Sequence, residues 1–221
     1  MRVVPVIVVG DAHALTAVAG VSMVVRSVRA LLTGAFVDRV TVLAAEGLRH
    51  EVERACAAEP VDVRPIVALD RVGAHAVQRP RATKSDGIIT AGTGDVVLLH
   101  DACRPLAPDA LAGAVVEAVR GGHGMAVPAL PLTDTVKSVD DNGLVTGTAD
   151  REALRVLQTP IAARAELLSG WTGEDPLAAV RRHMAAGGSV HLVPGHPSAF
   201  AVRSAWDLEL AELIAGGRIR L

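Results

Sequence analysis

Residues 95–105 read DVVLLHDACRP, and this stretch decides the fold of the chain. Four apolar residues run without interruption into His100 and Asp101, and Arg104 follows three residues later. A continuous apolar run of this kind is typical of a strand that is buried on both faces, as the central strands of parallel sheets are. Polar residues at the carboxyl end of such a strand lie where open α/β sheets bind their ligands.

Asp101 is the best single candidate for chemistry in this stretch. A carboxylate at a strand tip is able to hold a divalent cation, and the cationic Arg104 lies close to it in the sequence. The alternative is a loop aspartate that caps the next helix or pairs with Arg104. The segment by itself leaves both interpretations open.

Length, composition and charge narrow the class of protein. With 221 residues, half of them apolar, the chain is expected to form one domain with a large core. A net charge of −2 without a basic stripe argues against nucleic acid as a partner. Cys56 and Cys103 lie far apart and form no CxxC pair, which indicates a reducing compartment and gives no support for zinc.

No long apolar run is present, so no membrane span is expected, and the protein is predicted to be cytoplasmic. The opening residues 2–14 loosely imitate a secretory signal. Pro5 and the many valines favour an opening strand instead.

Strands and helices are expected to alternate as far as residue 129. This alternation predicts βαβ units and an α/β fold with a doubly wound, mostly parallel sheet. Later in the chain, Trp171 and Trp206 are expected to be packing residues. The expected strands are 3–9, 37–44, 61–67, 95–99, 125–129, 190–193 and 200–202, and the expected helices are 22–32, 47–58, 83–91, 108–120, 175–186 and 205–215.

The pattern changes after residue 131. Residues 133–139 and 144–148 are expected to form a β-hairpin around the turn DDNG, because Asn and Gly tolerate positive φ. A two-stranded ribbon is only marginally stable alone, so it should pack against a second subunit. We therefore expect one domain, 1–221, in which the segment 131–160 is a β-arm for dimerisation.

Five motifs occur in the order found in one known family. They are HDACRP at 100–105, TDTVK at 133–137, DR at 150–151, QTP at 158–160, and a closing stretch from Gly195 through DL at 207–208 to AE at 211–212. With these motifs, and with SVRALL at 27–32, the chain resembles the 2-C-methyl-D-erythritol 4-phosphate cytidylyltransferases of isoprenoid precursor synthesis (the non-mevalonate pathway). The resemblance covers nearly the whole chain.

The resemblance implies a fold and a reaction. The implied fold is that of the nucleotide-diphospho-sugar transferases, with a projecting hairpin arm that forms a homodimer. The implied reaction is an in-line attack of the phosphate of methylerythritol phosphate on the α-phosphate of CTP, with pyrophosphate leaving and Mg²⁺ as the cofactor. Asp101 is implied as the carboxylate on the metal and triphosphate side, and Arg104 as the residue that orders its loop.

The resemblance also implies binding residues. Thr135, Arg151 and Thr172 correspond to contacts with the methylerythritol phosphate, some of them across the dimer. An arginine fork and hydroxyl groups suit a phosphate monoester. On the nucleotide side, Gly10 and Thr83 correspond to positions that bind CTP.

The chain departs from the family in its nucleotide half. The family's first loop reads AAGxGxR followed by PKQ, whereas residues 8–16 here read VVGDAHALT, with no Arg or Lys between Arg2 and Arg26. Asp11 places a negative charge where phosphates should lie. The family motif GGxxRxxS aligns with AVQRPRAT at 76–83, and the lysine of the family's NIK falls at Ala201.

Several phosphate-facing cations are therefore missing together. Loss of one such group typically costs about 10²–10³ in rate, so two hypotheses stay open. One is an active cytidylyltransferase with a rearranged nucleotide loop; the other is a catalytically impaired paralogue that serves as a binding or regulatory protein. A Rossmann dehydrogenase is set aside because GDAHAL lacks GxGxxG. The candidates to replace the missing cations are Arg71, Arg79, Arg81 and Lys84, and the alternative is that this segment is a solvated loop.

Overall fold

An eight-stranded mixed sheet forms the centre of the computed structural model, which describes residues 1–35, 37–66, 91–168, 171–173 and 175–220. The strand order is β10-β7-β11-β6-β1-β4-β5, and β12 pairs with β7. Four of these strands, β1, β4, β5 and β6, run parallel to one another. Their bounds are Val3–Val9 for β1, Val40–Ala44 for β4, Val61–Pro65 for β5 and Val96–Asp101 for β6.

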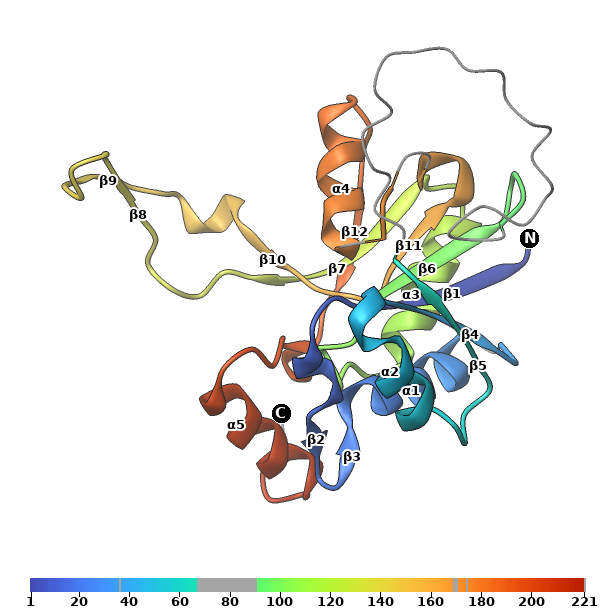
Figure 1. Cartoon of the computed structure of the whole chain (residues 1–221). Helices are drawn as coiled ribbons and strands as arrows, with labels where there is room; N and C mark the ends of the chain where they lie inside the picture. The colour runs from blue at the N-terminus through green and yellow to red at the C-terminus, as the bar shows by residue number, and fades with distance from the viewer. Residues whose placement is uncertain (36, 67–90, 169–170, 174, 221) are drawn as a thin grey trace, which may run out of the picture.

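Helices cover both faces of this sheet (Figure 1). On one face, Ile7 of β1 and Leu98 of β6 share a buried cluster with residues of α1 (Met23–Gly34), α2 (Arg49–Ala55) and α3 (Asp109–Arg120). On the other face, Val8 and Leu99 pack with residues of α4 (Pro176–Ala185). The central strands are thus buried on both sides, as their uninterrupted apolar runs predict.

One helix contact requires a glycine. A Cβ atom at Gly34, the last residue of α1, would clash with the backbone carbonyl oxygen of Asp109 at the start of α3. Glycine therefore allows these two helices to approach closely over β1 and β6.

The other half of the sheet is mostly antiparallel. It consists of β7 (Met125–Pro131), β10 (Arg155–Leu157), β11 (Ile161–Arg164) and β12 (His191–Pro194). Strand β11 lies between β6 and β7 and is antiparallel to both, and the sequence analysis did not predict it. The strand expected at 200–202 is wrong: these residues follow the 3₁₀ helix η5 (Pro197–Ala199) and belong to no strand.

The predicted hairpin is present and stands away from the sheet. Strands β8 (Lys137–Val139) and β9 (Val145–Thr148) form a separate antiparallel ribbon that projects from the body of the molecule (Figure 1). The Asp140 carboxylate accepts hydrogen bonds from the backbone N–H groups of Asn142 and Leu144, both at 2.9 Å, and Gly143 has a φ of 81°. These contacts close the turn that the sequence DDNG predicts.

The closing helix α5 (Ala205–Ala215) has the bounds that its sequence predicts. Ser204 and Asp207 cap it reciprocally in a capping box. The helix packs beside a small hairpin made of β2 (Ala17–Val18) and β3 (Val21–Ser22), and Glu212 accepts a hydrogen bond from the Ala19 N–H at 2.9 Å. Trp171 is buried as expected, but Trp206 of α5 is 72% exposed, so its predicted packing role is wrong.

No helix among the described residues is long and apolar enough to cross a membrane.

Candidate active site

The carboxyl ends of β1 and β6 form the topological switch point of the sheet. From β1 the chain passes through α1 to β4 on one side, whereas β6 pairs with β1 on the other side. In open α/β sheets, ligands bind in the crevice outside the strand ends at this point. The register pairs Val8 with Asp101, which brings the candidate carboxylate beside the loop that begins at Gly10.

A cavity of about 280 Å³ lies at this switch point. The described residues that line it are Val8, Gly10, Asp11, Asp101, Cys103, Asp175, Pro176 and Arg203. The cavity therefore lies between the end of β1, the end of β6, the start of α4 and the segment before α5.

Both carboxylate oxygens of Asp101 have partners. Oδ1 accepts a hydrogen bond from the Cys103 N–H at 2.9 Å, and Oδ2 accepts one from Nη2 of Arg203 at 2.6 Å. Asp101 thus closes a short turn after β6, and its ion-pair partner is Arg203. The alternative of an aspartate that caps α3 or pairs with Arg104 is wrong, since Pro108 is the N-cap residue of α3.

A buried threonine forms a hydrogen bond with the backbone of Asp101. Oγ1 of Thr159 accepts a hydrogen bond from the Asp101 N–H at 3.1 Å and lies 3.0 Å from Nδ1 of His100. Burial lowers the pKa of the His100 imidazole from its ordinary value to about 4, so the ring is neutral at pH 7. His100 is therefore a hydrogen-bonded residue of the strand end, and its low pKa does not suit a general base at neutral pH.

Arg104 extends away from Asp101. Nη1 donates to the carbonyl oxygen of Ala199 at 2.6 Å, and Nη2 donates to that of Leu157 at 3.5 Å. The side chain therefore ties the loop after β6 to η5 and to β10. Burial lowers the pKa of Arg104, while the charge of Asp101 opposes that shift. Arg104 does not belong to the described lining of the cavity, so the geometry favours a role in ordering the loop.

Arg203 is the cation that the sequence analysis did not single out. It lies between η5 and α5, and its side chain is 58% exposed. Partial burial acts to lower its pKa, but the Asp101 carboxylate, the Cys103 thiol and Asp11 outweigh this effect, so the pKa of Arg203 is raised. The sequence did contain a signal for Arg203. The family's lysine falls at Ala201, and in an extended chain the side chain two residues later, here Arg203, points to the same side.

The loop after β1 is not a glycine-rich cradle. The Asp11 carboxylate accepts a hydrogen bond from the His13 N–H at 2.8 Å and so caps the 3₁₀ helix η1 (Ala12–Leu15). The chain then enters the β2–β3 hairpin, which Glu212 of α5 holds in place. Gly10 and Asp11 both line the cavity, so Asp11 places a carboxylate there.

The residues expected to bind the acceptor lie apart from the described lining of this cavity. Thr135 is exposed before β8, and Arg151 begins the 3₁₀ helix η3 (Arg151–Ala153) on the returning strand of the arm. Nη1 of Arg151 donates to the carbonyl oxygen of Thr133 at 3.0 Å, which joins the two sides of the arm. Thr172 is half-buried just before α4.

Several predicted cations of the nucleotide side fall outside the described residues. They are Arg71, Arg79, Arg81 and Lys84, and the predicted nucleotide contact Thr83 also lies in that range.

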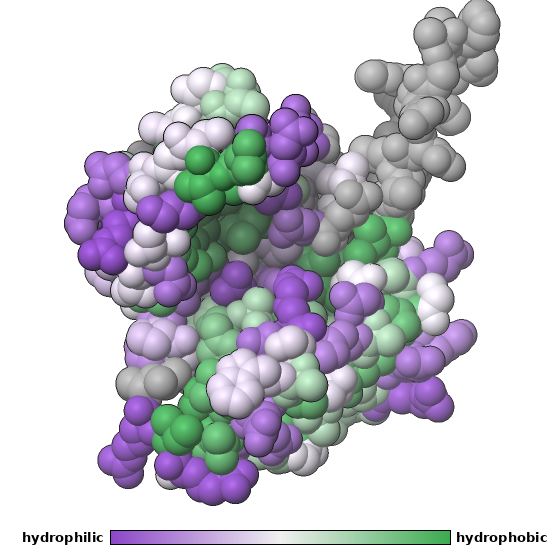
Figure 2. Space-filling view, turned by 90° about the vertical axis from the view of Figure 1, so that its left-hand side faces the viewer, coloured by the Kyte–Doolittle hydropathy of each residue, from purple (hydrophilic) through white to green (hydrophobic). Residues whose placement is uncertain are grey.

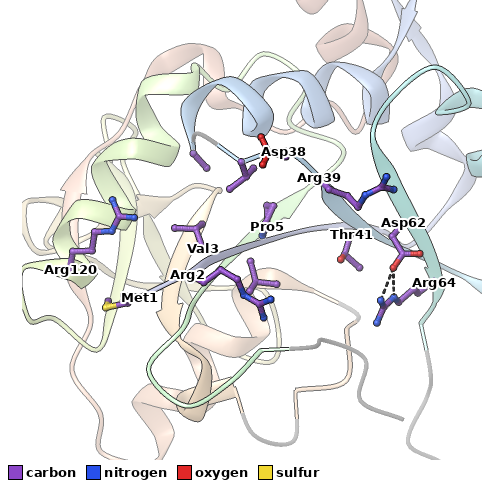
Figure 3. Close-up of a pocket in the computed structure, with 13 residues that line it drawn as sticks. Met1, Arg2, Val3, Pro5, Asp38, Arg39, Thr41, Asp62, Arg64 and Arg120 are labelled. Atoms are coloured by element: carbon purple, nitrogen blue, oxygen red, sulfur yellow. Dashed lines mark hydrogen bonds and ion pairs between the residues drawn. The ribbon is translucent and has the colours of Figure 1, made fainter. Parts of the chain in front are cut away.

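A larger cavity, of about 550 Å³, lies at the opposite edge of the sheet, where β1 and β4 begin (Figure 3). Its arginines already have partners: Arg64 pairs with Asp62 at 2.6 Å, Arg39 donates to the Val61 carbonyl at 2.9 Å, and Arg120 pairs with a glutamate of α3 at 2.8 Å. The amino ends of the strands lie here, whereas open α/β sheets bind ligands at the carboxyl ends of their strands. The candidate site is therefore the smaller cavity.

The doubly wound sheet and the charged crevice at its switch point are those of an α/β protein that binds its ligand at the carboxyl ends of the strands. The family model of 2-C-methyl-D-erythritol 4-phosphate cytidylyltransferase matches residues 7–216. The chain belongs to this family.

Two relatives support the assignment. A 2-C-methyl-D-erythritol 4-phosphate cytidylyltransferase from Nocardia farcinica is 40% identical over 212 residues, which cover 94% of this chain and 87% of the relative. One from Saccharopolyspora erythraea is 36% identical over 211 residues, covering 93% and 91%. The family predicted from the motifs is confirmed, and no comparison supports the impaired-paralogue alternative.

Solved structures show the same fold. The 2-C-methyl-D-erythritol 4-phosphate cytidylyltransferase of Thermus thermophilus is 26% identical, covers 98% of this chain and 100% of its own, and superposes with a TM-score of 0.65. The 4-diphosphocytidyl-2C-methyl-D-erythritol synthase of Anaerococcus prevotii has a TM-score of 0.70, with 97% and 98% coverage. At 16% identity, the latter speaks to the fold alone.

Proposed function

We propose that this chain transfers the cytidylyl group of CTP to the phosphate of 2-C-methyl-D-erythritol 4-phosphate and releases pyrophosphate. The observation that carries the proposal is that Asp101 and Gly10 line the same switch-point cavity in a chain of this family. The acceptor comes from the names of the relatives.

This reaction requires the protein to align the two substrates and to stabilise the charge on their phosphates. An oxygen of the acceptor phosphate attacks the α-phosphorus of CTP, and the bond between that phosphorus and the oxygen of pyrophosphate breaks as the new P–O bond forms. The attacking phosphate is already ionised at neutral pH, so no strong base is required. The neutral, buried His100 is consistent with this requirement. Phosphoryl-type transfers depend chiefly on alignment and on stabilisation of charge.

The cavity also suits Mg²⁺, which the family implies. When bound, Mg²⁺ would stabilise the charge of the phosphates and of the leaving pyrophosphate. Proteins hold Mg²⁺ with one or two carboxylates together with substrate phosphates, and Asp101 and Asp11 line the cavity. No group of three or more metal-ligating side chains occurs among the described residues, so the site fits a cation shared with the nucleotide.

Two other residues, Gly10 and Arg104, have a role in this proposal. Gly10 has no side chain, which lets a phosphate approach the backbone at the end of β1. Arg104 positions the loop that carries Asp101, through its hydrogen bonds to Ala199 and Leu157. Arg104 is thus a positioning residue in this proposal.

The acceptor site is proposed to form with a second copy of the chain. On the arm, Val139, Leu144 and Val145 are 61–66% exposed, and Figure 2, which views the side on which the arm projects, shows apolar patches there. Such side chains gain stability when they are covered, so a homodimer through residues 131–160 is proposed. The arm also carries Thr135 and Arg151, which with Thr172 are proposed to bind the acceptor phosphate.

The proposal is tested by pyrophosphate release from CTP in the presence of 2-C-methyl-D-erythritol 4-phosphate and Mg²⁺. We expect release that needs all three components and the enzyme. Release no faster than in a blank without enzyme, or release that does not need the acceptor, would refute the proposed reaction. The cytoplasmic location stays a prediction.

A further inference from the structure

Arg203 is the only basic residue in the described lining of the switch-point cavity, and three aspartates line the same cavity. One of the three, Asp175, is already engaged: it accepts a hydrogen bond from the Leu177 N–H at 2.9 Å and pairs with Arg181 at 2.8 Å. Asp11 and Asp101 remain. The crevice that must receive a triphosphate therefore presents two carboxylates and one guanidinium.

Hydrogen bonds hold the backbone around Arg203, while its side chain is largely exposed. The Val202 N–H donates to the Cys103 carbonyl at 2.7 Å, and the Arg203 N–H donates to the capping residue Asp207 at 3.0 Å. Among the described residues the guanidinium has one hydrogen-bond partner, Asp101 at 2.6 Å, and its side chain is 58% exposed. Its other N–H groups are available to a ligand in the cavity.

We propose that Arg203 binds the phosphates of CTP, and that it leaves Asp101 when it does so. In the free protein the guanidinium neutralises Asp101 and occupies Oδ2. When the nucleotide arrives, the guanidinium pairs with a phosphate, for which its planar fork is well suited, and Oδ2 becomes available to a divalent cation. This inference rests on the proposed function and assigns to Arg203 a role that the family motifs place on other residues.

The charges of the crevice favour such an exchange. A triphosphate that entered while Arg203 stayed on Asp101 would face Asp11 without a compensating cation. After the exchange, the guanidinium compensates the phosphates, and a cation compensates the carboxylates. Because coupling between two ligands is reciprocal, CTP should then tighten the binding of the cation, and the cation should tighten the binding of CTP.

The test compares the wild-type chain with Arg203→Gln, Arg203→Lys and a matched control. Arg29→Gln is the control, because Arg29 pairs with Glu59 at 2.7 Å and is 57% exposed, which nearly matches Arg203, yet Arg29 lies outside the cavity lining. Two quantities are measured: the Kd for CTP in the presence of Mg²⁺, by calorimetry, and the Kd for Mn²⁺ without nucleotide, by electron paramagnetic resonance. Thermal unfolding checks that each variant is folded.

The two measurements should move in opposite directions. Arg203→Gln is expected to weaken CTP by about 10- to 100-fold, since it removes a charge-assisted hydrogen bond to phosphate. The same variant should bind Mn²⁺ alone about 3- to 10-fold more tightly, because Oδ2 of Asp101 is vacated and a nearby positive charge is removed. Arg203→Lys should fall between, and Arg29→Gln should change neither.

Two results would overturn the role of Arg203 while the proposed function stands. One is an active wild-type enzyme whose Arg203→Gln variant keeps the wild-type affinity for CTP. The other is a variant that loses affinity for CTP and Mn²⁺ alike, which would show that Arg203 merely holds Asp101 in place. A wild-type chain that binds no CTP would overturn the proposed function, and this inference with it.

Discussion

Thr159 offers the sharpest test of how the fold holds the Asp101 carboxylate. Its side chain is buried, and its hydroxyl group serves both the Asp101 N–H at 3.1 Å and Nδ1 of His100 at 3.0 Å. Thr159→Val keeps the shape of the side chain and removes the hydroxyl group. The buried Nδ1 of His100 and the part-buried N–H of Asp101 would then lose their partner, and each such loss costs about 1–3 kcal/mol. We therefore expect a loss of about 2–6 kcal/mol in the free energy of unfolding.

Thr159→Ser is the matched control, because it keeps the hydroxyl group and removes only a buried methyl group. That change costs about 1 kcal/mol. The assay is equilibrium unfolding in urea, with all variants at one protein concentration, since a dimer's stability depends on concentration. If Thr159→Val proves no less stable than Thr159→Ser, the hydroxyl group does not support the strand end, and the reasoning about Asp101 fails.

Three further predictions follow from other parts of the structure. Burial lowers the pKa of His100 from 6.5 to about 4, so the neutral ring contributes its full stability above pH 6.5, and about 3 kcal/mol is lost as the pH falls toward 4. In His100→Gln, the free energy of unfolding measured in urea should therefore change less with pH between 6.5 and 4 than in the wild-type chain. An equal change with pH in both chains would contradict the assignment. Burial, and then the charge of Asp101, raises the pKa of the Cys103 thiol to about 12. A thiol reagent at pH 8 should therefore leave Cys103 unmodified until the protein unfolds, and rapid labelling of Cys103 in the native protein would refute this. If the proposed arm interface forms, light scattering after gel filtration should give the mass of a dimer for the wild-type chain and that of a monomer for the double change Val139→Asp and Leu144→Asp; a wild-type monomer at micromolar concentration would refute the interface.

Local sequence signals predicted those elements whose stability is local or whose burial is complete. The run of residues 96–99 is apolar without interruption because both faces of β6 are covered, so the pattern alone identifies a central strand. Helix α5 begins where Ser204 and Asp207 form a capping box, and the hairpin turns where Asp140 and Gly143 close it. For α5 and the hairpin turn, the interactions that fix the element lie within a few residues of one another.

The missed features depend on residues distant in sequence. Strand β11 is short and contains two alanines, which have low strand propensity, and it exists because β6 and β7 offer hydrogen bonds on both sides. Trp206 was expected to pack, but it lies on a face of α5 that the described chain does not cover. Arg104 was a candidate partner of Asp101, yet the carbonyl of Ala199, 95 residues away, holds it instead.

Arg203 changes how the departures from the family should be weighed. The loop after β1 lacks the family's arginine and lysine, and it adds Asp11 to the cavity. Taken alone, these changes leave a crevice that repels a triphosphate. The structure places one cation there from a segment 192 residues further along the chain than Asp11, within hydrogen-bond distance of Asp101. With two carboxylates and one guanidinium in its described lining, the crevice would need a divalent cation to accept CTP in the proposed reaction. The affinity for CTP should consequently depend on that cation more steeply than in a site whose loop supplies its own arginine and lysine.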